Sequence, residues 1–185
     1  MLRSESDCTD PITEVCLSED FKCTSSEVVS SVFDEIGRGI EEGGLKRFEI
    51  EYFQDRNSLE AWPLSQIVCK AVNCEHVRIA NLSRTTENNR IVLVDFVAQI
   101  CSVSVCLKTL SLCRTASSVE SGIEVFQTLA DGDLSTLEQI TLNHETLWFG
   151  GRSECLDLLL VALARQQNLR KLNVKENGFT QDQQE

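Results

Sequence analysis

The chain has 185 residues, of which 42% are hydrophobic and 25% charged, with only two prolines; this composition is typical of a folded protein and argues against disorder throughout. Its net charge is −12, and residues 1–60 hold 15 acidic but only 6 basic side chains. Because no dense basic stripe is present, we do not expect the chain to bind nucleic acid or an anionic membrane surface.

No apolar run reaches the roughly 18 residues that cross a bilayer, so membrane insertion is not expected. Residues 1–25 are acidic and polar, unlike a signal or transit peptide, which predicts a cytoplasmic protein, with a nuclear or organellar location left open. Nine cysteines is an odd number, and most lie within apolar periodic stretches. We interpret them as reduced core thiols rather than a disulfide framework.

The chain divides into three parts. Residues 1–25 show no firm period and are expected to form an acidic N-terminal tail or an irregular cap over the first helix. Residues 26–180 form the periodic region described next, and residues 181–185 are a short C-terminal tail.

The periodic region alternates between two patterns. In the first pattern, apolar residues recur at i, i+3, i+4 and i+7, which predicts helices that bury one face. These stretches are Val29, Val32, Phe33, Ile36; Leu64, Ile67, Val68, Ala71; Leu93, Phe96, Val97, Ile100; Ile123, Phe126, Leu129, Ala130; and Leu156, Leu159, Leu160, Leu163. Trp62 and Pro63 are predicted to begin the second helix, since proline is tolerated in a first turn.

The second pattern is a short segment with apolar residues at its first, fourth and sixth positions. The five segments are Leu45, Phe48, Ile50; Cys74, Val77, Ile79; Leu107, Leu110, Leu112; Leu137, Ile140, Leu142; and Leu169, Leu172, Val174. Their central residues are 29, 33, 30 and 32 positions apart, and each lies 13 to 15 positions after the centre of the preceding helical stretch. This constant phase predicts a repeat.

A helix followed by a strand cannot bury its apolar face alone, and stacking several such units solves the problem. The strands are then parallel, because a helix connects each strand to the next. Helices are wider than the strand spacing, so the stack bends with the helices outside. The sequence therefore predicts an α/β fold: a short right-handed horseshoe of about five units with a parallel sheet on its concave face.

The last unit begins at Leu169 and reads LRKLNVKENGF. It resembles the leucine-rich repeat consensus L-x-x-L-x-L-x-x-N-x-L, and the unit containing Leu137, Ile140, Leu142 and Leu147 is a looser match. The chain is similar to leucine-rich repeat proteins of the ribonuclease-inhibitor type over about residues 28 to 180. The resemblance implies a leucine-rich repeat solenoid.

The sequence departs from this family at one position. The family's asparagine, which satisfies backbone groups in the turn after each strand, is matched only by Asn177. The equivalent residues of the earlier units are Phe53, Leu82, Thr115 and Glu145. At least two turns must therefore satisfy their backbone groups in another way.

Alternation along the strands predicts which side chains line the concave face. The first row is Arg47, His76, Thr109, Gln139, Lys171; the second is Glu49, Arg78, Ser111, Thr141, Asn173; the third is Glu51, Ala80, Cys113, Asn143, Lys175. This mixed polar surface is negative at its amino end and positive at its carboxyl end. It is interpreted as a docking face for another protein, although such residues also serve simply to keep a sheet face soluble. Glu49 and Arg78 are placed to form a cross-strand pair.

We select as candidate partner-binding residues the members of this surface with the most distinctive chemistry, together with one aromatic residue. They are Arg47, Glu49, Glu51, His76, Arg78, Gln139, Asn143, Trp148, Lys171 and Lys175. Trp148 and Phe149 precede two glycines, which fits either an exposed aromatic anchor on a loop or residues of the core.

Catalysis is not expected. His76 and His144 are the only histidines, and no local signature pairs either with a cysteine nucleophile. The cysteines lack the short C-x-x-C pairs of a zinc site, and no glycine-rich phosphate loop occurs, so neither a metal nor a cofactor is predicted.

The chain runs only about ten residues past its fifth strand, so the carboxyl edge of the sheet is expected to be uncapped. A partner, another copy or further sequence would then cover it. The sequence predicts a non-enzymatic protein-interaction module or scaffold, which is also compatible with a subunit of a larger complex. Two alternatives remain open: a ligand-sensing fragment of a larger innate-immune-type receptor, and a GTPase regulator.

Overall fold

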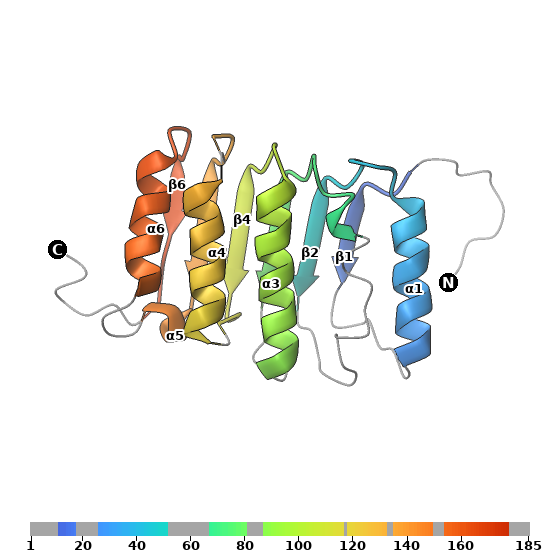
Figure 1. Ribbon diagram of the computed structural model, residues 1–185, viewed down its shortest axis with the longest axis horizontal. Helices are drawn as coiled ribbons and strands as arrows, with labels where there is room; N and C mark the ends of the chain where they lie inside the picture. The colour runs from blue at the N-terminus through green and yellow to red at the C-terminus, as the bar shows by residue number, and fades with distance from the viewer. Residues whose placement is uncertain are drawn as a thin grey trace.

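The computed structural model describes residues 11–17, 26–51, 67–80, 87–116, 118–132, 135–149 and 154–177. These residues form an α/β structure, as expected, in which helices lie side by side along one face of a parallel sheet (Figure 1). The labelled elements follow the chain from one end of the sheet to the other (Figure 1). The other face of the sheet, which no described helix covers, is called the open face below.

Six strands follow one another across the sheet in sequence order, and each pairs in parallel with its neighbours. They are β1 (Glu14–Leu17), β2 (Arg47–Glu51), β3 (His76–Ala80), β4 (Thr109–Cys113), β5 (Gln139–Asn143) and β6 (Lys171–Asn173). Each of the five predicted segments supplies one strand, from β2 to β6. The prediction of parallel strands joined in sequence order is therefore confirmed.

The helices confirm most of the predicted helical stretches. They are α1 (Ser26–Gly39), α3 (Glu87–Val103), α4 (Val119–Asp131), the single turn α5 (Thr146–Phe149) and α6 (Glu154–Arg165). The helix expected to begin at Trp62 and Pro63 lies mostly outside the described residues, and the predicted tail at 181–185 lies wholly outside them.

The segments form strands because their alternate side chains are buried under the helices. Burial alternates strictly along β2, β4 and β5. In β2 to β5 the central apolar residues of the repeat, Phe48, Val77, Leu110 and Ile140, are at most 1% exposed. The helices contribute large side chains to the same core, among them Phe33, Phe96 and Phe126. Phe48 and Phe96, far apart in the chain, pack edge to face with ring centroids 4.7 Å apart.

The sequence analysis expected an acidic tail or an irregular cap over residues 1–25, and the strand β1 corrects this within residues 11–17; the rest of that range lies outside the described residues. Glu14–Leu17 pairs in parallel with β2 and forms the amino edge of the sheet. Its Val15 and Leu17 side chains are 4% and 7% exposed and join the core. Four residues with two buried positions give a pattern too short to distinguish from irregular structure in the sequence.

The turns that follow β4, β5 and β6 share one backbone conformation. In each turn one residue has a left-handed φ, between 58° and 61°. These residues are Arg114 directly after β4, His144 directly after β5, and Glu176 in the turn that follows β6. The next residue in each case is Thr115, Glu145 or Asn177, and all three are buried. These are the residues that the sequence analysis aligned with the asparagine of the consensus.

Asn177 and Glu145 each bind the turn of the preceding unit. The Asn177 side chain accepts from the Glu145 N–H at 2.7 Å and donates to the carbonyls of Leu142 and Val174. The Glu145 carboxylate in turn accepts from the N–H groups of Thr115 and Ala116, at 2.9 Å and 2.6 Å, and from the Thr115 hydroxyl. The turn after β4, which has Thr115 instead of asparagine, is thus satisfied by the carboxylate of Glu145 from the next unit, which offers acceptors only.

Candidate functional site

The register of the sheet confirms the first two rows of open-face residues. Arg47, His76, Thr109, Gln139 and Lys171 are successive partners across β2 to β6, and Glu49, Arg78, Ser111, Thr141 and Asn173 are the next. Strand β1 extends these rows with Glu14 and Cys16, which the sequence analysis did not include. The third row runs from Glu51 to Asn143, and Lys175 lies beyond the end of β6.

At the amino end of the open face, the charged side chains pair with one another. Arg47 lies 3.2 Å from Glu49 and 3.8 Å from Glu14. Arg78 donates two hydrogen bonds of 3.1 Å to Glu51, and these bonds raise the pKa of its guanidinium. The expected pair between Arg78 and Glu49 is therefore replaced by a diagonal pair, although the two residues are register partners. Such partly exposed pairs contribute little to stability, typically under about 1 kcal/mol.

The centre of the open face is uncharged and rich in hydrogen-bonding groups. Its six side chains on β4 and β5 are Thr109, Ser111, Cys113, Gln139, Thr141 and Asn143, all partly exposed. His76 of β3 shares a 2.9 Å hydrogen bond with the Thr109 hydroxyl. The Asn143 side-chain oxygen accepts a hydrogen bond from the Lys175 N–H at 3.1 Å, so part of its hydrogen-bonding capacity is already used within the chain.

The carboxyl end of the open face carries exposed positive charge. Lys171 and Lys175 are exposed, and neither forms an ion pair with any residue that the structure describes. They differ in this respect from Arg47 and Arg78, whose charges are already balanced. Of the candidate residues, these two lysines offer the charge most open to a partner.

A further row of charges lies just before the strands, on the rim of the sheet, and its sign alternates from unit to unit. The row consists of Lys46, Glu75, Lys108, Glu138 and Arg170. Lys108 forms an ion pair with Glu75, and this hydrogen bond lowers the pKa of Glu75 and raises that of Lys108. The sequence analysis did not select this row, although the alternating signs at repeat spacing would have revealed it.

Trp148 is not an exposed anchor, and its selection as a partner-binding residue is corrected by the structure. Its side chain is 0% exposed, and its indole N–H donates to the Ser118 carbonyl at 2.9 Å. The ring packs edge to face on Phe126, with centroids 5.6 Å apart. The single turn α5 directs Trp148 inward between α4 and α6, where it serves the core.

The described cysteines include buried thiols, as the sequence predicted. Cys74 and Cys101 are free and buried, and burial raises their pKa to about 11 and about 12. Such thiols remain protonated at neutral pH and are poor nucleophiles. No group of three or more potential metal ligands occurs among the residues that the structure describes.

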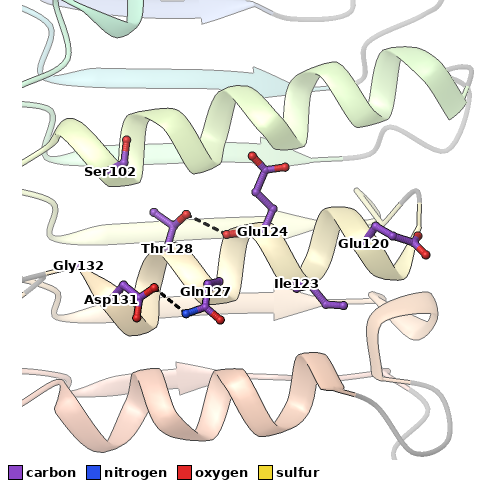
Figure 2. A pocket seen from close by; sticks show the side chains of 8 residues that line it. All are labelled: Ser102, Glu120, Ile123, Glu124, Gln127, Thr128, Asp131 and Gly132. Atoms are coloured by element: carbon purple, nitrogen blue, oxygen red, sulfur yellow. Dashed lines mark hydrogen bonds between the residues drawn. The ribbon is translucent and has the colours of Figure 1, made fainter.

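A shallow groove of about 520 Å³ lies on the helical side of the molecule (Figure 2). It follows α4 from Glu120 to Gly132 and reaches Ser102 at the end of α3. Figure 2 shows its polar side chains spread along the helix rather than converging on one point, and Gln127 and Asp131 bond to each other at 2.6 Å. The groove thus lacks the convergent polar groups of a ligand site.

Comparisons with family models, with curated proteins and with solved structures gave no match to this chain. Among the described residues, no helix has both the length and the apolar character needed to span a membrane.

Proposed function

We propose that this chain is a leucine-rich repeat solenoid of the ribonuclease-inhibitor type. Three features support the assignment: the regular spacing of the units, the sequential parallel sheet with helices along one face, and the turn that recurs after β4, β5 and β6. The links from Asn177 to Glu145 and from Glu145 to Thr115 join successive turns, as the consensus asparagine would. The predicted concave face is then the open face.

The proposed function is non-enzymatic binding of a protein partner through this open face. The observation that carries the proposal is the uncovered central surface of β4 and β5, where six uncharged polar side chains stand in register. Strands hold such side chains in place, so less conformational entropy is lost when a partner binds. The paired charges of β2 and β3 flank this surface on one side and Lys171 on the other.

A variant with arginine in place of Ser111 and Thr141 tests the proposal, because these neighbours lie at the centre of the open face. A partner would be isolated by affinity purification from native extract, identified by mass spectrometry, purified, and titrated against the variant. The control variant replaces Ser102 and Gln127, both exposed on the helical side, with arginine. We expect the open-face variant to lose binding and the control variant to retain it, with equal thermal stability.

The opposite pattern, loss of binding only in the helical-side variant, would assign the partner to the helices. A partner that binds both variants as well as it binds the unchanged chain would also contradict a role for the open face. Charge reversal of Glu49 and Glu51 then tests whether the amino end of the face contributes; because these carboxylates already bind arginines, we expect a smaller effect there.

A further inference from the structure

We propose that the outer edge of β6 binds an extended acidic segment of a partner protein, which adds to the sheet as a seventh parallel strand. This inference goes beyond the binding role proposed for the open face and does not depend on it. Strand β6 is the last in the sheet and pairs only with β5 within the described residues. Its other edge therefore presents main-chain groups for a further strand.

The apolar surface at this edge resembles a core that lacks its next unit. Leu172 is 45% exposed, whereas the equivalent residues of β2 to β5 are at most 1% exposed. In the last described helix, α6, Leu160 and Val161 are also exposed, by 55% and 46%. A partner strand with an apolar residue opposite Leu172 would restore the burial that the inner strands have.

The charge at this edge indicates an acidic partner. The alternating row on the rim ends at Arg170, which follows Glu138, so the next strand would place an acidic residue there. Arg170, Lys171 and Lys175 are all exposed, and no ion pair joins any of them to an acidic residue of the described chain. Cations therefore stand before and after the apolar Leu172 along the strand, which fits a segment with acidic residues on both sides of an apolar centre.

The direction and register of the added strand follow from the sheet. Each of the five strand pairs is parallel, and the rows run straight across them. A seventh strand in the same register would place acidic residues opposite Arg170, Lys171 and Lys175, and apolar residues opposite Leu172 and Val174. A second copy is less well suited, because Val15 and Leu17 of its edge strand β1 are already buried.

The experiment uses a fluorescein-labelled synthetic peptide with the central sequence Glu-Glu-Val-Thr-Val-Glu and the whole chain at physiological salt. Binding is followed by fluorescence anisotropy, and backbone protection by hydrogen exchange with mass spectrometry. We expect the acidic peptide to bind and to slow exchange of the β6 amides. Because the chain carries a net charge of −12, long-range repulsion opposes this peptide, so binding reports the local positive charge.

A charge-swapped pair makes the test specific. The variant Arg170→Glu/Lys171→Glu/Lys175→Glu should lose at least tenfold in affinity for the acidic peptide, a factor of ten being about 1.4 kcal/mol. It should instead bind the peptide Lys-Lys-Val-Thr-Val-Lys. Arg38→Glu, on α1 at the opposite end of the sheet, is the control and should leave binding unchanged (Figure 1). Proline in place of the peptide's threonine should weaken binding, since proline removes a main-chain donor.

Four results would overturn the proposal. The first is equal binding of the acidic and lysine peptides, and the second is binding without protection of the β6 amides. The third is a dimer that protects β6 as concentration rises, which would make a second copy the occupant. The fourth is protection of both edges of β6 in the monomer before peptide is added, which would mean that the chain itself covers the edge. A failure here leaves the open-face titration unaffected.

Discussion

Buried polar side chains link successive turns of this molecule. Asn177 and Glu145 each reach back to the preceding unit, and both are at most 1% exposed. The Glu145 side chain offers only acceptors, and it faces two backbone N–H groups and one hydroxyl. Burial raises the pKa of this carboxyl, while the same hydrogen bonds act to lower it. The residue therefore acts as a bridge between turns.

Replacing Glu145 with alanine tests this bridge. We expect Glu145→Ala to lower the free energy of unfolding by about 1–3 kcal/mol, because the buried N–H groups of Thr115 and Ala116 lose their acceptor. Urea denaturation followed by circular dichroism measures the change. Glu138→Ala, at an exposed glutamate of the rim, is the control and should stay within about 0.5 kcal/mol of the unchanged chain. Equal effects of the two substitutions would contradict the bridging role.

The ion pair between Lys108 and Glu75 gives a prediction about pH. Its hydrogen bond holds the pKa of Glu75 below the ordinary carboxyl value. The pair therefore stabilises the folded state at pH values above the ordinary carboxyl pKa. This contribution is lost as the pH falls through the lowered pKa of Glu75. We expect Lys108→Ala to raise the pKa of Glu75 toward its ordinary value, as measured by NMR titration of its side-chain carboxyl. Lys70→Ala, on the loop before β3, is the control. An unchanged pKa in Lys108→Ala would show that another group lowers it.

At the scale of elements, the helix α4 shows how local sequence and tertiary contacts act together. Ser118 caps its N-terminus: its hydroxyl accepts from the Ser121 N–H, and the Ser121 hydroxyl accepts from the Ser118 N–H. The Ser118 carbonyl also accepts from the Trp148 indole. The start of α4 is thus fixed both by its own capping residues and by a side chain from α5.

We expect Ser118→Ala to lower the free energy of unfolding by about 1 kcal/mol, the usual cost of losing a helix cap. The bond from Trp148 ends on the main chain and survives the substitution, so the tertiary contact should not change. Urea denaturation measures the stability, and tryptophan fluorescence, recorded with Trp62 replaced by phenylalanine, reports the Trp148 contact. Ser102→Ala, near the end of α3, is the control. A loss of several kcal/mol together with a changed emission maximum would mean that the cap also supports the tryptophan.

At the scale of the whole molecule, each strand from β2 to β5 pairs with a neighbouring strand along both of its edges, whereas β6 has one described neighbour. Residues at one repeat position therefore differ in burial according to their place in the stack. Leu110 is 0% exposed and Leu172 is 45% exposed, although both are the central apolar residue of their strand. In the repeat stack that we propose, stability depends on these nearest-neighbour contacts.

This difference predicts unequal costs for one substitution at two equivalent positions. We expect Leu110→Ala to lower the free energy of unfolding by about 2–5 kcal/mol, as for other buried leucines. Leu172→Ala should cost only about 1 kcal/mol, because nearly half of its surface is already exposed to water. Chemical denaturation of the two variants measures both values. A comparable loss in both would mean that Leu172 is buried in solution, and hence that something covers the edge.

The sequence by itself determined the repeating part of the architecture. Apolar residues at a fixed phase predicted the strands β2 to β6, their parallel order and the first two open-face rows, because side-chain alternation and repeat spacing are local properties of the chain. The same reasoning selected Lys171 and Lys175 as positive residues at the carboxyl end. It did not find β1, whose four residues are too few for their alternation to be distinguished from irregular structure.

Only the tertiary structure decided which side chains meet. Trp148 fits a loop or a core equally well in the sequence, and its place between α4 and α6 comes from packing against Phe126. Arg78 pairs with Glu51 rather than Glu49, because the contact depends on how two side chains extend across neighbouring strands. Glu145 bridges two turns only because the previous turn brings two N–H groups to its carboxylate. Periodicity is a local property of the sequence, so it predicts helices and strands. The contacts named here join residues that are distant in the chain or depend on side-chain direction, so periodicity does not predict them.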